Sequence, residues 1–131
     1  MSAPRTAPLP KSKAAIHLRK ASNFLRAAQS ALHDRNFDAA GLAGLHAVIS
    51  ACDGLTVSKL GLRSTAQNHS DVLRLLVNTG MPEATMTQVR ETLSLKSRAE
   101  YEARELGEDE AAQIVTRAAR VVAYAQLAIP T

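Results

Sequence analysis

The sequence predicts an all-α fold, an up-and-down four-helix bundle with one additional short helix. Four long segments carry apolar residues at intervals of three and four, which is the period of one helix face. No segment alternates apolar and polar residues for long enough to predict a strand. Aromatic residues make up 3% of the 131 residues, so Leu, Val, Ile and Ala must form the core, as suits closely approaching helices. The length corresponds to a single domain.

The first eleven residues differ from the rest of the chain. They contain three prolines among small and basic residues, which favours neither a helix nor a packed core. We therefore expect residues 1–11 to be a disordered, basic, proline-rich arm and residues 12–129 to form one helical domain.

The first long helix is expected to begin near Ser12 and to end between Asp34 and Phe37, with Asn36 or Asp38 capping the second helix. Its apolar stripe consists of Leu18, Ala21, Leu25, Ala28 and Leu32. The second helix has a stripe of Leu42, Leu45, Ile49 and Cys52. Gly41 and Gly44 lack side-chain bulk within this helix, which predicts a closely packed neighbour. Gly54 and Gly61 are expected to bracket a weakening of the second helix.

Three further helices follow a polar connection at residues 63–68. A short helix begins near His69, and Gly80 followed by Met81-Pro82 predicts its end and the start of the next. That fourth helix, with Met86, Val89 and Leu93 on its apolar face, should end near Leu106-Gly107. The last helix opens with three acids, residues 108–110, which complement the positive end of its dipole, and it should end at Pro130.

The charge is unevenly distributed along the chain. Residues 1–35 hold seven Lys or Arg and one acid, a local charge of +6, whereas residues 36–131 hold nine against eleven, a local charge of −2. Such asymmetry could steer an anionic partner. No aromatic residues interleave with the basic ones as on a base-stacking surface, which disfavours direct nucleic-acid binding by the arm.

Composition and motifs exclude several classes of protein. Cys52 is the only cysteine, so no internal disulfide or thiolate metal cluster can form, and it should pack as a small hydrophobe. The four histidines, His17, His33, His46 and His69, do not have the spacing of a helical metal pair. We expect no metal and no cofactor. With no apolar run of membrane-spanning length and no signal-peptide segment, the expected location is the cytoplasm, without membrane association.

The most informative segment is Lys96-Ser97-Arg98-Ala99-Glu100-Tyr101. Arg, a carboxylate and Tyr near a helix end suit a polar site better than a core. The same residues could instead form a solvated helix face, with the Tyr101 ring packed and its hydroxyl in water, and spacing alone favours this reading. His69 could likewise either cap the third helix or face a pocket.

The order of these segments resembles the HEPN domain, over roughly residues 14–127. The resemblance rests on His69-Ser70-Asp71-Val72, on Leu95 to Tyr101, and on Glu110-Ala111-Ala112 leading to Ala118-Ala119-Arg120-Val121-Val122. It is closest to the compact bacterial branch with a His at the start of the third helix and a later Arg-x-x-Asp-Tyr motif, here with Glu in place of Asp. It implies a helical bundle that forms a homodimer, with a polar cleft near the dimer seam. Relatives include RNA-cutting toxins and partners of antitoxins, and others bind nucleotides.

The leading hypothesis is a non-catalytic binding or interaction module, associated with a nucleotide or RNA or belonging to a toxin-antitoxin system. RNA-cutting relatives carry Arg, four to six residues, then His late in the chain, but no His follows Arg98. The polar cleft would be lined by His69, Arg98, Glu100 and Tyr101, and Arg98 could receive an anionic ligand.

Two alternatives remain at this point. Arg63 and His69 satisfy the Arg-to-His spacing at another place in the chain, so a metal-independent endoribonuclease toxin would use His69 for proton transfer and Arg63 or Arg98 to stabilise the phosphate. The chain could also be a purely structural protein that dimerises through apolar helix faces. A cognate antitoxin or another protein could be its partner.

Overall fold

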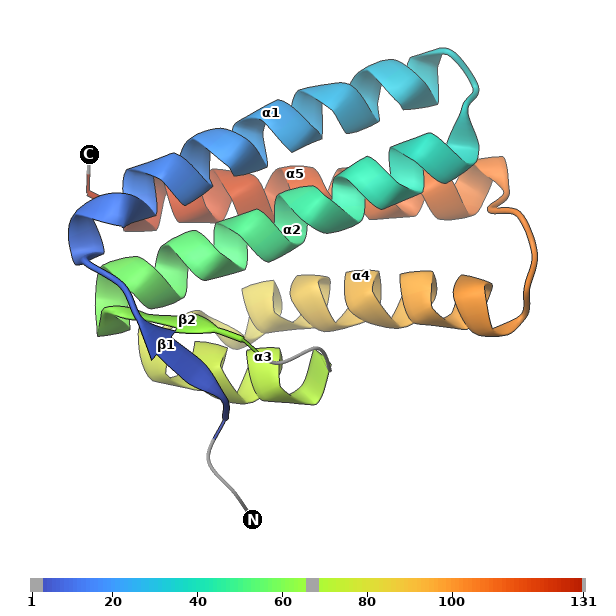
Figure 1. Cartoon of the computed structure of the whole chain (residues 1–131). Helices are drawn as coiled ribbons and strands as arrows, with labels where there is room; N and C mark the ends of the chain where they lie inside the picture. Colours follow the sequence, from blue (N-terminus) through green and yellow to red (C-terminus); the bar gives the residue numbers. More distant parts are fainter. Residues whose placement is uncertain (1–3, 66–68, 131) are drawn as a thin grey trace.

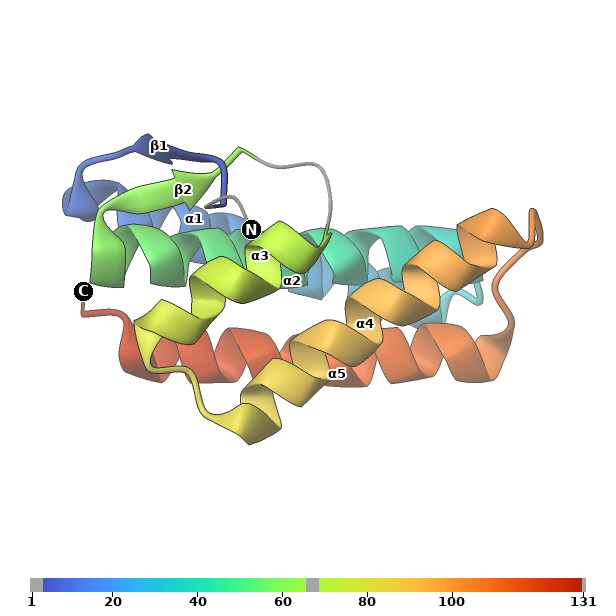
Figure 2. The ribbon, with the colours of Figure 1, turned by 90° about the horizontal axis from the view of Figure 1, so that it is seen from below.

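The chain is mostly helical, as expected from the sequence (Figure 1). This computed structural model describes the backbone of residues 4–65 and 69–130, and all their side chains except those of residues 69, 96 and 99–101. Within these ranges the elements are β1 (Thr6–Pro8), the 3-10 turn η1 (Lys11–Lys13), α1 (Ala14–His33), α2 (Phe37–Leu60), β2 (Leu62–Ser64), α3 (His69–Leu76), the 3-10 turn η2 (Val77–Thr79), α4 (Glu83–Tyr101) and α5 (Glu108–Ala128). Consecutive long helices run in opposite directions, and α4 crosses α5 obliquely (Figure 2).

Helix α2 is the centre of the fold, since it contacts α1, α4 and α5. Its fully buried side chains include Val48, Leu55 and Val57. The predicted close packing at Gly41 and Gly44 is confirmed, because a Cβ atom on Gly44 would lie 2.8 Å from Cγ2 of Ile114 in α5. A side chain at Gly41 would collide with Leu106. The two glycines therefore set how closely the final helix approaches.

The expected weakening of the second helix at Gly54 is wrong. Helix α2 continues without a break to Leu60 and ends at Gly61, whose φ of 66° is in the left-handed region. A Cβ atom on Gly54 would lie 3.1 Å from Cδ1 of Ile129, so this glycine makes room for the end of the chain. The Lys59 ammonium also donates to the Ala128 carbonyl at 2.7 Å, tying the ends of α2 and α5 together.

The N-terminal segment also differs from the expectation of a disordered arm with no strands. β1 pairs antiparallel with β2, with Ala7 opposite Arg63, and the pairing is flanked by hydrogen bonds from Thr65 N to Arg5 O and from Leu9 N to Gly61 O. The backbone N–H and C=O groups of residues 5, 7 and 9 thus face β2. The prolines are at positions 4, 8 and 10, where the backbone faces away, so their missing N–H groups cost no ladder bond.

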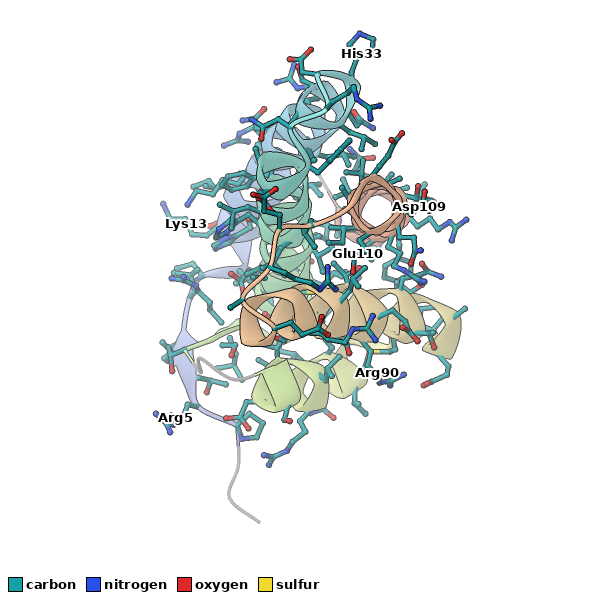
Figure 3. The ribbon with its side chains drawn as sticks, turned by 90° about the vertical axis from the view of Figure 1, so that its right-hand side faces the viewer. Arg5, Lys13, His33, Arg90, Asp109 and Glu110 are labelled. Atoms are coloured by element: carbon teal, nitrogen blue, oxygen red, sulfur yellow. The ribbon has the colours of Figure 1, made fainter. Side chains whose placement is uncertain are left out.

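The expected end of the fourth helix near Leu106-Gly107 is wrong, because α4 ends at Tyr101 and Ala103 has a φ of 53°, in the left-handed region. The other turns match the sequence pattern. Gly80 has a φ of 81° after η2, and α4 begins after Pro82. Helix α5 begins with its three acids in the first turn, and the Glu110 carboxylate accepts from Gly107 N at 3.1 Å. In Figure 3, Lys13 and Arg5 lie on the left of the molecule, and Asp109 and Arg90 lie on the right.

Two expectations about α2 have structural outcomes. Cys52 is buried in the core, as expected for a small hydrophobe. By length and mean hydropathy α2 could cross a membrane, contrary to the expectation that no apolar run has such a length. However, 67% of its most apolar window is buried inside the fold, which accounts for that hydropathy as core packing.

Candidate functional site

An open pocket of about 440 Å³ lies between α3 and α4, the two helices nearest the viewer in Figure 2. It contains Arg98, one of the residues singled out in the sequence. The lining residues are Ser70 and Leu73 from α3, and Arg90, Leu93, Ser94, Ser97 and Arg98 from α4. Leu73 and Leu93 form an apolar floor, and the other five side chains can all donate hydrogen bonds.

The spacing along α4 explains why these polar groups share one face. Arg90, Ser94 and Arg98 recur every four residues, so they form a row along one side of the helix. The two arginines are separated by two turns, about 12 Å along the axis, with the Ser94 hydroxyl between them. Figure 3 shows Arg90 directed away from the helix body. Its guanidinium is 3.6 Å from the Glu83 carboxylate, an exposed ion pair that a stronger anion could displace.

Arg98 is exposed and has no ion-pair partner among the described side chains. The nearby Glu110 carboxylate is already engaged, because Arg104 donates to both of its oxygens at 2.6 Å. These bonds, the Gly107 amide and the charge of Arg98 lower the pKa of Glu110 to about 2. Arg98 therefore keeps donors available for an anion in the pocket.

The sequence also predicted His69, Glu100 and Tyr101 as lining residues of this cleft. The side chains of His69, Glu100 and Tyr101 lie outside the described residues. The backbone of His69 begins α3 and directly precedes Ser70, which lines the same pocket as Arg98. The sequence analysis missed Arg90 and the serines. Their four-residue spacing to Arg98 on one predicted helix could have placed Arg90 and Ser94 on the same helix face as Arg98.

Arg63, the arginine of the alternative catalytic reading, lies elsewhere. Its Nε is 3.7 Å from Oδ2 of Asp53, and it lines a different pocket between α1, α2 and β2. Arg63 and Arg98 thus do not meet at one site among the described residues. His46 lies in the same pocket as Arg63, where it is exposed and its ring stacks on Phe24 at a centroid distance of 5.3 Å.

The described residues contain no group of three or more His, Cys, Asp or Glu side chains that could hold a metal ion. Comparisons with protein-family models, curated proteins and solved structures found no match to this chain. The case for a function therefore rests on the residues themselves.

Proposed function

We propose that this chain is a non-catalytic binding module with a HEPN-like four-helix bundle, and that its α3–α4 pocket binds a phosphate group of a nucleotide or RNA. The observation that carries the proposal is the flanking of the pocket's serine hydroxyls by Arg90 and Arg98. Guanidinium groups match phosphate geometry with paired N–H donors, and serine hydroxyls can donate to phosphate oxygens.

The available charge of Arg98 supports this proposal. Glu110, the acid whose pKa responds to Arg98, is neutralised by two short bonds from Arg104. Among the described side chains, an arriving phosphate would therefore meet no ion-pair competitor for Arg98, and would compete with the exposed Glu83 pair for Arg90.

Binding assays with adenosine monophosphate and with a short single-stranded RNA test the proposal. We expect Arg98→Ala to weaken binding about tenfold, since a hydrogen bond to a charged group is worth about 1.5–3 kcal/mol. Arg26→Ala is the matched control, because Arg26 is an exposed arginine on α1 whose guanidinium bonds Asn23 and does not line the pocket. Equal losses in the two variants would reduce the effect to net charge and refute a specific site.

The same preparation tests the catalytic alternative. We expect the RNA to remain intact during prolonged incubation with the pure protein in the presence of a chelator. Cleavage that disappears in His69→Ala would overturn the non-catalytic assignment. A homodimer belongs to the same proposal, and sedimentation of the chain at several concentrations measures it.

A further inference from the structure

The pocket between α1, α2 and β2 is a second built cavity, of about 380 Å³, unrelated to the phosphate site. Three elements contribute to it, although they are far apart in the sequence. Its lining residues are His17, Lys20 and Phe24 from α1, His46, Ile49, Ser50 and Asp53 from α2, and Arg63 from β2. Its volume suits a small molecule.

One end of this pocket carries charges of both signs. The Asp53 side chain is only 16% exposed, and its Oδ2 lies 3.7 Å from the Arg63 Nε, outside ordinary hydrogen-bond length. Burial raises the pKa of Asp53 to about 6, against the opposing effects of Arg63 and Lys20, so the carboxylate is still mostly ionised at pH 7.5. Burial, together with Arg63 and Lys20, lowers the pKa of His17, which keeps that imidazole neutral. The charged end thus presents one carboxylate beside two cations.

The other end of the pocket is apolar and lies one helical turn away. Ile49 precedes Asp53 by four residues on α2, and Phe24 follows Lys20 by four residues on α1. Because α1 and α2 are antiparallel, both steps of about 6 Å lead toward the turn that joins the two helices. There the Phe24 and His46 rings stack with an interplanar angle of 29°. A ring of a ligand could pack against this pair.

We propose that this pocket binds a free α-amino acid with an aromatic side chain. Arg63 and Lys20 bind the carboxylate of the ligand, Asp53 accepts from its ammonium group, and its ring packs on Ile49 and the Phe24–His46 pair. The two ligand charges are on neighbouring groups of one carbon atom, which matches the adjacent Asp53 and Arg63. The ring of an aromatic amino acid lies about one helical turn from its charged groups, which matches the distance to Ile49 and Phe24.

Ligands with a single charge fit this arrangement less well. A phosphate dianion would meet the two cations but would also face the partly buried Asp53 carboxylate. A simple amine would bind Asp53 but would be repelled by Lys20 and Arg63. Only a zwitterion satisfies both signs, since an unpaired charge in a partly buried site is costly.

Calorimetric titration of the intact chain at pH 7.5 with L-phenylalanine tests this proposal directly. Three probes each lack one feature: phenethylamine lacks the carboxylate, 3-phenylpropionate lacks the ammonium group, and L-alanine lacks the ring. We expect saturable binding of L-phenylalanine and at least tenfold weaker binding of each probe, as the loss of one charged hydrogen bond or of ring burial implies. Failure to saturate with L-phenylalanine up to about 10 mM, or equal binding of 3-phenylpropionate, would overturn the proposal.

A pair of variants locates the site. Asp53→Asn should weaken L-phenylalanine binding at least tenfold, whereas Asp34→Asn, the same change at an exposed turn position, should leave it unaltered. Amide NMR shifts on titration should cluster at residues around His17, Ile49 and Asp53, and thermal melting verifies that both variants fold. Unchanged binding by the folded Asp53→Asn variant would refute the assignment. The phosphate assays with Arg98→Ala are independent of this outcome.

Discussion

Replacing Asp53 with Asn should stabilise the protein at neutral pH. The Asp53 carboxyl is partly buried on α2, the central helix, and burial is the largest cause of its raised pKa. The Asn side chain has nearly the same shape without the charge, so the substitution removes the cost of desolvating a carboxylate. The geometry of the pocket should be retained.

The size of this effect follows from the two pKa values of Asp53. Its ordinary value is 3.8 and its value in the folded chain is about 6. At 1.36 kcal/mol per pH unit this difference corresponds to roughly 3 kcal/mol. Between these pH values the folded state binds more protons than the unfolded state, so the free energy of unfolding falls as the pH rises through this window. Because pH 7 lies above both values, Asp53→Asn should raise the free energy of unfolding there by nearly the whole of this difference, about 3 kcal/mol or roughly 11 °C in Tm, and very little below pH 4.

Urea unfolding at pH 3.5, 5 and 7 measures both the gain and its pH dependence. Asp34→Asn is again the control, because that side chain lies exposed in the turn between α1 and α2. Our reasoning would be refuted by a variant that is no more stable than the parent at pH 7. It would equally be refuted by a gain of the same size at all three pH values.

Three further predictions concern the scaffold. Leu55→Ala should lower the free energy of unfolding by about 2–5 kcal/mol in urea unfolding, because this fully buried side chain leaves a cavity; a loss below about 1 kcal/mol would contradict its burial. Glu110→Gln should destabilise the chain more at pH 7 than at pH 2, because the lowered pKa of Glu110 gives stability that is present above pH 4.5 and lost as the pH falls through about 2; urea midpoints at the two pH values test this. Cys52 is buried, and burial raises the pKa of its thiol, so a thiol reagent should label it no faster than the chain unfolds. Rapid labelling of the folded chain would disprove this.

The helices were predictable because their signals are local. The stripe from Leu18 to Leu32, the stop at Gly80 and the acids that open α5 all act within one or two turns of the chain. By contrast, the end of α2 was misjudged at Gly54, whose reason is contact with Ile129 at the far end of the sequence. Local propensity cannot report such a contact.

The candidate sites were only partly predictable for the same reason. Arg98 was recognised from its neighbours in the chain, but its pocket also needs Ser70 from another helix. The second pocket joins residues from three elements, and nothing in the local sequence distinguishes Asp53 as a partner of Arg63. Its signal, a carboxylate in the middle of an apolar helix, becomes informative only once the fold brings a cation to it.

The pairing of β1 with β2 has a consequence for the behaviour of the chain in concentrated solution. The outer side of β1 is one of the two edges at which a strand from another molecule could add. Within β1, Thr6 and Pro8 face outward there, and prolines also stand just before and after the strand at positions 4 and 10, so few amide hydrogens are available. An incoming strand would find almost no donors, so this edge resists aggregation by strand addition. The same prolines that permit the strand thus oppose growth of the sheet at the β1 edge.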